Sequence, residues 1–249
     1  MSSLLDWKAL NGFAEEGIAS FHAKRLASLQ KLKLKTVLKR KNPYLFKAKN
    51  LLTASDLVKT LLDAHLSSQE ETIFGDFLEE LAIYINGQIF GGKKSSSEGV
   101  DLEFDRDGIR YLLSIKSGPN WGNSSQIKKM QDNFAKARKV LHTGNSKLHV
   151  QAVNGCCYGQ DSQPNKDNYR KLCGQRFWAF ISGDETLYTR LIEPIGHRAK
   201  EKNEGFLKQY AKVTNLFAQE FMQDFCVDGE IEWVKLVEFN SGNKGEKDD

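Results

Sequence analysis

The sequence predicts an α/β fold in which a central mixed β-sheet is flanked by helices, with helical additions at both ends. Three observations support this fold class. Apolar residues recur at helical spacing up to residue 90 and again over 124–142, residues 100–116 contain two strand-like segments, and another follows at 147–155. The resulting order is α-β-β-α-β. We expect the last strand to be parallel to an earlier one, because the helix between them makes a crossover.

The first ninety residues predict mainly helices. The apolar spacing of residues 4–29 indicates one or two of them. Another is expected at Thr53, whose hydroxyl can cap the helix while Asp56 reaches back. A further helix begins near Ser67 or Ser68, and Gln88–Phe90 predicts a short strand.

The central segment predicts a hairpin. Strands are expected at 100–104 and 109–116, joined by a turn at 105–108 (DRDG). A helix then opens at Ser124. Residues beyond about 168 are expected to be helical almost to the end. We therefore predict one domain over 1–240, with a basic helical part (1–66), a core (67–157) and a mainly helical part (158–240), followed by a disordered tail at 241–249.

Composition excludes several classes of protein. The 249 residues carry 36 Lys+Arg against 32 Asp+Glu, a net charge of +4 that identifies no partner by itself. No window approaches the roughly 20 apolar residues of a membrane span, and the N-terminal segment lacks the apolar stretch of a signal peptide. Four cysteines, two of them adjacent, do not form a disulfide framework, so we expect a cytoplasmic protein without a membrane partner.

Motifs for other chemistries are weak. Cys156, Cys157 and Cys173 with His149 or His197 suggest zinc only superficially, because adjacent cysteines rarely bind one ion together. We expect these cysteines to be small buried residues. No Walker-type phosphate loop or dinucleotide-binding fingerprint is present, so nucleotide hydrolysis and hydride transfer lose support.

The hairpin carries the most informative polar residues. Asp101 and Glu103 share one strand face, and Ser114 and Lys116 share a face of the partner strand. Each residue taken alone is most often part of a solvated surface. Together, carboxylates and a lysine at strand ends suit a hard divalent cation such as Mg²⁺, with the lysine beside a water or a phosphate oxygen.

An acid, a hairpin and x-x-Lys on the next strand resemble the PD-(D/E)XK nuclease core, as does the α-β-β-α-β order. Gly75 to Glu79 matches the Gly-x-x-x-Glu that this superfamily often has on the preceding helix. The segments SIKSGPNWGNS (114–124) and GQRFWAFISGDETLY (174–188) are similar to stretches of Type II restriction endonucleases, including those grouped with PmeII. The catalytic resemblance covers about residues 70–155, and the similarity to restriction enzymes covers most of the chain.

The sequence departs from the superfamily pattern in two places. Val100-Asp101 stands for Pro-Asp, and Ser114-Ile115-Lys116 stands for acid-x-Lys. The missing acid must come from elsewhere. Glu103 is the first candidate because it shares a face with Asp101, and Glu79 is equally plausible. Weaker candidates are Glu71 and Asp132, with Gln126 as a neutral substitute.

The resemblance also implies a mechanism. Asp101 and either Glu79 or Glu103 would bind Mg²⁺, for which Mn²⁺ can substitute, and the main-chain carbonyl of Ile115 would add a ligand. Lys116 would position the attacking water and stabilise developing charge. The product would carry a 5′-phosphate.

Basic and polar segments predict DNA contacts. Residues 31–50 contain eight of the Lys+Arg and no acid, which favours contact with phosphates over an ordinary solvated helix end. Gly, Ser and Lys residues in the loop 91–97, and amides and hydroxyls after Lys116, are further candidates. The predicted DNA-binding residues are Lys39, Arg40, Lys41, Lys47, Lys93, Lys94, Ser117, Asn120, Asn123, Ser124 and Gln126.

The resemblance implies a Mg²⁺-dependent Type II restriction endonuclease that cleaves double-stranded DNA at a short specific sequence. Cutting both strands of a palindrome requires two active sites, which implies a homodimer. A companion DNA methyltransferase would protect host DNA. Two alternatives stay open: a structure-specific repair or recombination nuclease, and a non-catalytic DNA-binding module that lost the acid at Ser114 and binds DNA without cleaving it.

Overall fold

The computed structural model describes residues 5–144, 146–197 and 199–243, and the chain divides into two compact units. The first unit comprises residues 1–19 and 74–197, and the second comprises 20–73 and 198–249. Two long helices, α1 (Trp7–Lys31) and α4 (Ala54–Phe90), contribute to both units. Each unit has its own hydrophobic core. The single functional domain expected over 1–240 stays a prediction.

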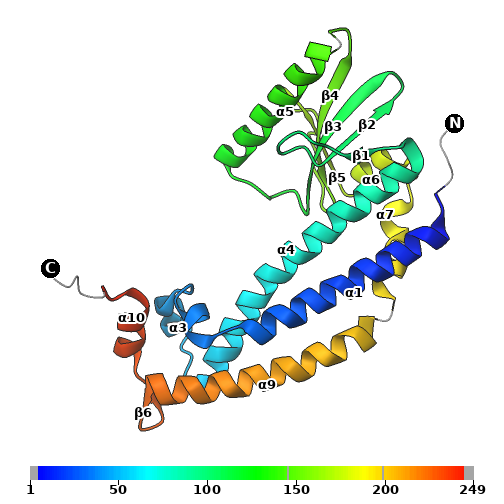
Figure 1. Ribbon diagram of the computed structural model, residues 1–249. Coiled ribbons are helices and arrows are strands. Elements are labelled where there is room, and N and C mark those ends of the chain that lie inside the picture. Colours follow the sequence, from blue (N-terminus) through cyan, green and yellow to red (C-terminus); the bar gives the residue numbers. More distant parts are fainter. Residues whose placement is uncertain (1–4, 145, 198, 244–249) are drawn as a thin grey trace. The chain divides into compact units, whose positions relative to one another are not determined.

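The first unit is built on a five-stranded mixed sheet in the order β1-β2-β3-β4-β5 (Figure 1). Its strands are β1 (Lys93–Lys94), β2 (Leu102–Arg106), β3 (Ile109–Lys116), β4 (His149–Cys156) and β5 (Arg170–Cys173). β1, β2 and β3 pair antiparallel, and β3, β4 and β5 pair parallel. Helix α5 (Ser124–Gly144) makes the crossover from β3 to β4. The predicted fold class is therefore confirmed.

A two-residue turn closes the β2–β3 hairpin. Asp107 and Gly108 both have positive φ, 52° and 76°, as a type I′ turn requires. Asp-Gly suits this turn because Gly has no steric penalty at positive φ and Asp tolerates it. Beside the turn, Arg110 Nη2 donates to Asp105 Oδ2 at 2.7 Å. The turn fixes the register in which Leu102 faces Leu113 and Phe104 faces Tyr111.

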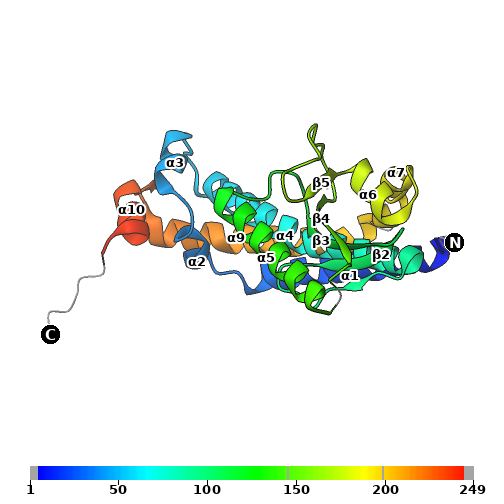
Figure 2. The same ribbon diagram turned by 90° about the horizontal axis from the view of Figure 1, so that it is seen from above.

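Helices cover both faces of this sheet (Figures 1 and 2). Leu102, Tyr111 and Leu113 join a core that includes residues of α1, α4 and α6 (Gln175–Ser182). On the other face, Leu112 and Ala152 pack with Phe134 of α5. The alternation follows from the period of two along a strand, and it leaves the polar strand ends at one edge. The short helices α7 (Leu187–Arg190) and α8 (Ile192–Gly196) complete the unit.

The second unit is mainly helical. It includes α2 (Leu34–Leu38), α3 (Pro43–Ala48), α9 (Ala199–Phe225) and α10 (Trp233–Ser241), together with a small antiparallel hairpin of β6 (Cys226–Val227) and β7 (Glu230–Ile231). Its core contains buried side chains of α2, α4 and α9, among them Leu34, Leu57, Leu61 and Phe221. No described helix of the chain combines the length and the apolar character that crossing a membrane requires.

Three local predictions are wrong. Thr53 and Asp56 do form the expected reciprocal cap, but the helix continues unbroken through Ser68 to Phe90. Ser68 does not end it, because its hydroxyl donates to the carbonyl of Ala64 within the same helix. The strand expected at 88–90 is the last turn of α4.

Residues 170–173, expected to be helical, form β5 because they pair with β4, and residues 226–231 form a hairpin. These pairings depend on the folded chain, so local periodicity does not reveal them. The tail predicted to be disordered begins at Ser241, which ends α10, and residues 244–249 lie outside the described part of the chain.

Phe134→Ala should lower the free energy of unfolding by about 3–5 kcal/mol, because Phe134 is 2% exposed and joins α5 to the sheet. Urea unfolding followed by circular dichroism measures this loss. Val140→Ala on the same helix is the matched control. Its side chain is 69% exposed, so a change within about 0.5 kcal/mol is expected. Equal losses in the two variants would contradict the assignment of this core.

Candidate active site

Asp101 is held in place by the strand beside it. Its N–H donates to the carbonyl of Leu113 at 2.7 Å, which continues the hairpin pairing beyond β2. Its carboxylate oxygen Oδ2 accepts from the N–H of Ile115 at 2.6 Å and from the Ser114 hydroxyl at 3.4 Å. Lys116 Nζ lies 3.8 Å from the same oxygen. Among the described residues these contacts all go to Oδ2, which leaves Oδ1 for another partner.

Glu79 approaches this carboxylate from helix α4. Gly75 and Glu79 are four residues apart and therefore lie on the same helix face. An added Cβ at Gly75 would lie 3.0 Å from the hydroxyl of Ser117, the residue after β3. The absence of a side chain at Gly75 thus lets α4 pass close to the end of β3. One turn later, Glu79 reaches the neighbourhood of Asp101 and Lys116.

The acid from α4 is hard to ionise in this neighbourhood. Burial raises the pKa of Glu79, and the nearby Asp101 carboxylate raises it further. The cations of Lys94 and Lys116 oppose the rise without cancelling it. Lys94 Nζ lies 3.8 Å from Glu79 Oε1, but the lysine side chain is 71% exposed, so water screens much of its attraction. A cation between the two carboxylates would remove the conflict.

Glu103, the first candidate for the missing acid, points elsewhere. It lies opposite Leu112 in the hairpin, and its Oε1 is 3.8 Å from Lys93 Nζ. The charge of Glu103 also raises the pKa of Arg110. The charges that shift the pKa of Glu79 are those of Asp101, Lys94, Lys116 and Asp76. The structure therefore brings Glu79 near Asp101 and Lys116, and it pairs Glu103 with Lys93.

The structure places the weaker candidates in other settings. Glu71 belongs to the second unit, and Asp132 is exposed on α5. Gln126 is occupied at the start of α5, where it accepts a hydrogen bond from the N–H of Asn123.

The donor set fits Mg²⁺ better than zinc. The described residues contain no group of three or more His, Cys, Asp or Glu side chains that could bind a metal. Two carboxylates and a main-chain carbonyl are nonetheless enough for Mg²⁺, which keeps several waters and takes phosphate oxygens from its substrate. Burial raises the pKa of the Cys157 thiol to about 12. A thiol that stays protonated is a poor zinc ligand, in agreement with the expectation that the cysteines are structural.

The comparison with protein families decides the class. The family model for Type II restriction endonuclease EcoO109I matches residues 8–203. The chain belongs to this family of restriction endonucleases. No curated protein sequence matches the chain. The resemblance to restriction endonucleases is confirmed, whereas the grouping with PmeII stays a prediction.

The loop after β3 is pinned in this restriction endonuclease by a residue that sequence reasoning missed. Buried Asn154 on β4 accepts from Trp121 Nε1 at 3.0 Å and donates to the Ser114 carbonyl at 3.1 Å. Lys116 Nζ lies 5.5 Å from the centre of the Trp121 ring. Asn154 thus connects the loop to the catalytic strand. The only sequence signal was a polar residue beside apolar ones near the end of the predicted strand, which is the buried part of β4.

The predicted DNA-binding residues fall into two groups. In the first unit, Asn123 and Gln126 cap α5 reciprocally, with each side chain accepting from the other's N–H at 2.9–3.0 Å. Ser124 is the first residue of α5, Ser117 directly follows Lys116, and Asn120 is exposed. Lys93 and Lys94 form the ion pairs with Glu103 and Glu79.

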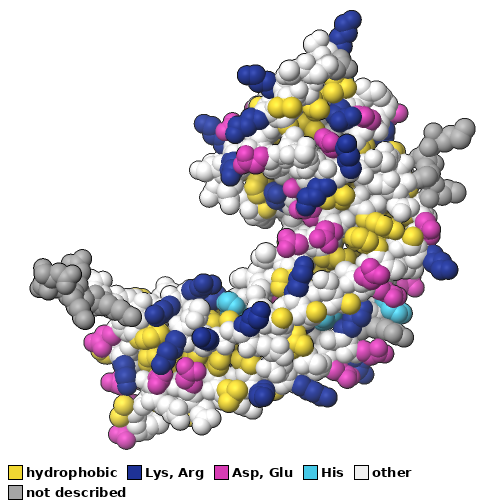
Figure 3. All heavy atoms as spheres, in the orientation of Figure 1, with side chains coloured by type: hydrophobic (Ala, Val, Ile, Leu, Met, Phe, Trp, Pro, Cys, Tyr) yellow, Lys and Arg dark blue, Asp and Glu magenta, His cyan; other side chains and the backbone are white. Residues whose placement is uncertain are grey.

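The other predicted residues, Lys39, Arg40, Lys41 and Lys47, belong to the second unit. Three of them are exposed on or after α2 and α3, whereas Lys41 is half-buried and donates to the carbonyl of Ala64. Figure 3 shows Lys and Arg side chains gathered over α3 and its surroundings. Burial lowers the pKa of His65, and the Lys41 and Arg40 cations lower it further. The smaller contribution of the two cations is in the direction expected at a positively charged surface.

Helix α5 carries a second basic surface that the sequence did not lead us to predict. Lys128, Lys129, Lys136 and Lys139 are exposed on the side opposite the buried Phe134. Figure 3 shows Lys and Arg side chains along the outer side of this helix. Their helical spacing was visible in the sequence, but it became informative only once the apolar face of α5 was known.

Glu79→Gln should raise the melting temperature near pH 7 in the absence of divalent cations. The pKa of Glu79 is raised above its ordinary value of 4.5, so the folded protein binds more protons than the unfolded chain in the range just above that value. Ionisation of Glu79 therefore lowers stability as pH rises through this range, and a neutral amide avoids the loss. Thermal melts from about pH 4 to about pH 8 should show the variants diverging as pH rises.

Glu80→Gln, at the exposed neighbouring position, controls for the loss of one negative charge. An equal gain in that variant would attribute the effect to net charge and contradict a local conflict between Glu79 and Asp101.

Proposed function

We propose that the chain is a Mg²⁺-dependent endodeoxyribonuclease that hydrolyses both strands of DNA at a specific short sequence. Membership of the restriction endonuclease family supports the reaction class. The observation that carries the proposal is the convergence of Asp101, Glu79 and Lys116 at the end of β3. A charged lysine beside two acids suits phosphodiester hydrolysis, in which a water must be oriented and negative charge develops at phosphate.

Asp101 and Glu79 would bind the Mg²⁺, with the main-chain carbonyl of Ile115 as a further ligand. When bound, Mg²⁺ polarises the phosphate and lowers the pKa of a water. Lys116 is 32% exposed, so its ammonium can reach both solvent and a bound phosphate. We assign it two roles: it orients the attacking water, and it stabilises the negative charge that develops on the phosphate oxygens. The product would carry a 5′-phosphate.

Ser114 supports Asp101 in this scheme and is not itself a ligand. It is 2% exposed, and its hydroxyl donates to Asp101 Oδ2. Together with the N–H of Ile115, it directs one carboxylate oxygen toward β3 and the other away from it. Glu79 then supplies the second acid that the superfamily pattern has at position 114.

The basic surfaces would contact DNA phosphates. We include Lys39, Arg40, Lys41 and Lys47 of the second unit, and the α5 lysines together with Lys93 and Lys94 of the first. We also include Ser117, Asn120 and Asn123 of the loop that follows the active site, and Ser124 and Gln126 in the first turn of α5. We further propose a homodimer with two active sites and a companion methyltransferase.

Asp101→Asn and Lys116→Ala should each reduce cleavage of a mixed-sequence plasmid in MgCl₂ at least about 100-fold, because each removes a group that binds the cation or stabilises charge. The wild type should give discrete fragments on a gel. Asp105→Asn in the same hairpin and Lys8→Ala on α1, both exposed and outside the site, should cleave normally.

Three results would contradict the proposal. Cleavage at branched or damaged DNA without sequence preference indicates a repair nuclease. Salt-dependent binding without cleavage in Mg²⁺ or Mn²⁺ indicates a non-catalytic module. Unchanged activity in Asp101→Asn would remove the assigned site.

Arg40→Gln and Lys47→Gln should weaken DNA binding and make its dependence on salt shallower. Removing one cation that neutralises a phosphate should reduce the slope of log affinity against log salt by about one. Fluorescence anisotropy without divalent cations at several salt concentrations gives this slope. Lys208→Gln on α9, an exposed lysine of the same unit, is the control. The same change of slope in the control would indicate a general charge effect rather than a DNA-binding surface.

A further inference from the structure

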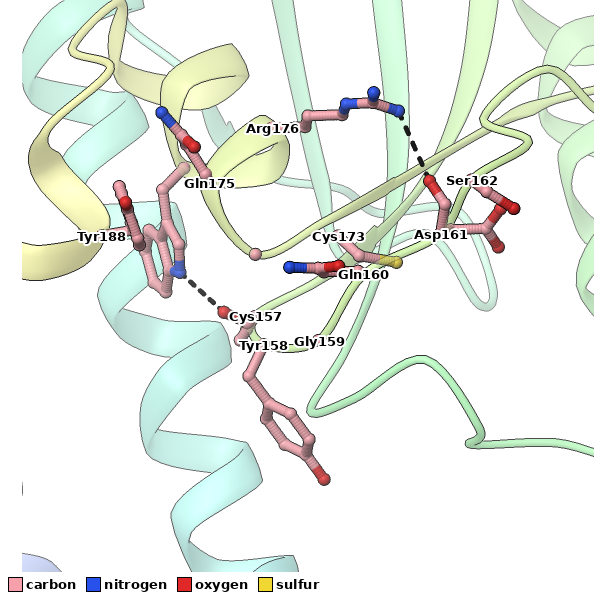
Figure 4. A pocket seen from close by; sticks show the side chains of 12 residues that line it. Cys157, Tyr158, Gly159, Gln160, Asp161, Ser162, Cys173, Gln175, Arg176 and Tyr188 are labelled. Atoms are coloured by element: carbon pink, nitrogen blue, oxygen red, sulfur yellow. Dashed lines mark hydrogen bonds between the residues drawn. The ribbon is translucent and has the colours of Figure 1, made fainter.

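A pocket of about 630 Å³ opens beside the active site (Figure 4). Its lining comes from two segments, residues 157–162 after β4 and 173–178 at the junction of β5 and α6, together with Tyr188. Both segments follow parallel strands at their carboxyl ends. None of the catalytic residues assigned above lines it.

The pocket lies within reach of DNA held at Lys116. Cys157 N–H donates to the Lys116 carbonyl at 2.9 Å, and Tyr158 N–H donates to the Ser117 carbonyl at 3.0 Å. Lys116 pairs with Cys156, which in turn pairs with Cys173 at the end of β5. Strands are spaced by about 4.8 Å, so the end of β5 lies about 10 Å from the end of β3. Base pairs rise by about 3.4 Å, so this distance spans about three steps from the phosphate at Lys116.

The inner part of the pocket is formed by buried, uncharged side chains. Trp178 is 4% exposed, and its Nε1–H donates to the Cys157 carbonyl at 2.7 Å (Figure 4). Cys157 and Cys173 are buried, and burial keeps the pKa of Cys157 high. These groups offer neither a nucleophile nor a metal ligand. The pocket is therefore suited to binding rather than to a second reaction.

The loop on one side of the pocket is anchored. Asp161 forms ion pairs with Lys166 and Lys171, each at 3.3 Å. Lys171 Nζ also donates to the carbonyl of Pro119, in the loop that follows the catalytic strand. The segment 158–162 is thus joined to the catalytic loop by named contacts, as a site that must be positioned relative to the cut phosphate requires.

Two polar side chains remain available for a ligand. Arg176 is exposed in the first turn of α6, and one Nη1–H donates to the carbonyl of Asp161 at 3.4 Å (Figure 4). That long contact leaves most of the guanidinium donors unused among the described residues. Gln160 is exposed and lines the same pocket. Gln175, by contrast, is directed to Glu185, whose carbonyl and carboxylate accept from its amide.

We propose that this pocket contacts base edges within about three base pairs of the cut phosphodiester, with Arg176 as a guanine-binding side chain and Gln160 beside it. The guanidinium fork matches the O6 and N7 acceptors of guanine, and a glutamine amide matches the N6 and N7 of adenine. Direct readout needs a side chain with available donors that is held in a fixed position. Arg176 is exposed and weakly paired, and it lies beside the segment 158–162 that is joined to the loop after β3. The inference rests on the proposed nuclease function and adds specificity-determining residues to it.

Sequencing of fragments cut from a randomised DNA library tests the proposal. The wild type first defines the recognition sequence. Arg176→Ala should then lose preference for guanine at one position near the cut by about 10- to 100-fold, with other positions unchanged. Arg176→Lys should recover part of it, because a lysine can still donate to guanine. Gln160→Ala should relax a different, neighbouring position.

The matched control is Arg110→Ala, an arginine at the opposite end of β3 that pairs with Asp105. Its recognition profile should equal that of the wild type. A second probe replaces the guanine with 7-deazaguanine, which lacks the N7 acceptor. Wild-type cleavage should fall at that position, and Arg176→Ala should show no further loss.

Outcomes separate the inference from the function on which it rests. An active Arg176→Ala enzyme with an unchanged profile overturns the inference alone. A uniform loss across all sequences also overturns it, because it indicates a phosphate contact. Absence of cleavage by the wild type in any divalent cation overturns the proposed function, and the inference with it. Circular dichroism of each variant shows whether it is folded.

Discussion

The hydrogen bond from the Ile115 N–H to Asp101 Oδ2 is the constraint on which the site depends. It joins the segment before β2 to the end of β3, so the hairpin cannot shift its register without losing the carboxylate's position. Because the donor is a main-chain group, the direction of the carboxylate is set by the sheet itself. Lys116 follows on the same strand, and its ammonium therefore lies beside the same oxygen.

The fixed position of Asp101 affects the ionisation of Glu79 on α4. A carboxylate fixed at 19% exposure repels the half-buried Glu79, and the lysines present do not restore its ordinary pKa. A protein selected only for stability would avoid two such acids. Their position beside a close helix–strand approach at Gly75 supports the proposed cation site. The buried thiol of Cys157 nearby, whose pKa is raised by burial, adds no further charge to this site.

Local signals predicted the hairpin, the crossover helix and the parallel strand. Asp107-Gly108 encodes the turn, and alternation along 100–116 encodes the register. The continuity of α4 and the existence of β5 could not be predicted, because a serine inside a helix and a four-residue strand are decided by tertiary contacts. The sequence left Glu79 and Glu103 both open for the same reason, and which of them acts stays a prediction; the structure pairs Glu103 with Lys93 and brings Glu79 near Asp101 and Lys116. Strand periodicity put Glu103 on the same face as Asp101. It lies about 7 Å further along the strand, where it forms an ion pair with Lys93.

In the proposed site, the charges already present explain why a serine suits position 114 better than an acid. The site already holds two carboxylates, Glu79 and Asp101, opposed by Lys94 and Lys116. A third carboxylate at the buried position 114 would contact the same Asp101 oxygen that Ser114 now donates to. It would replace a donor with a repelling acceptor and raise the pKa of Glu79 further. An acid on the helix and a hydroxyl on the strand thus form a consistent pair: once α4 supplies Glu79, the strand position is better filled by a neutral donor that orients Asp101.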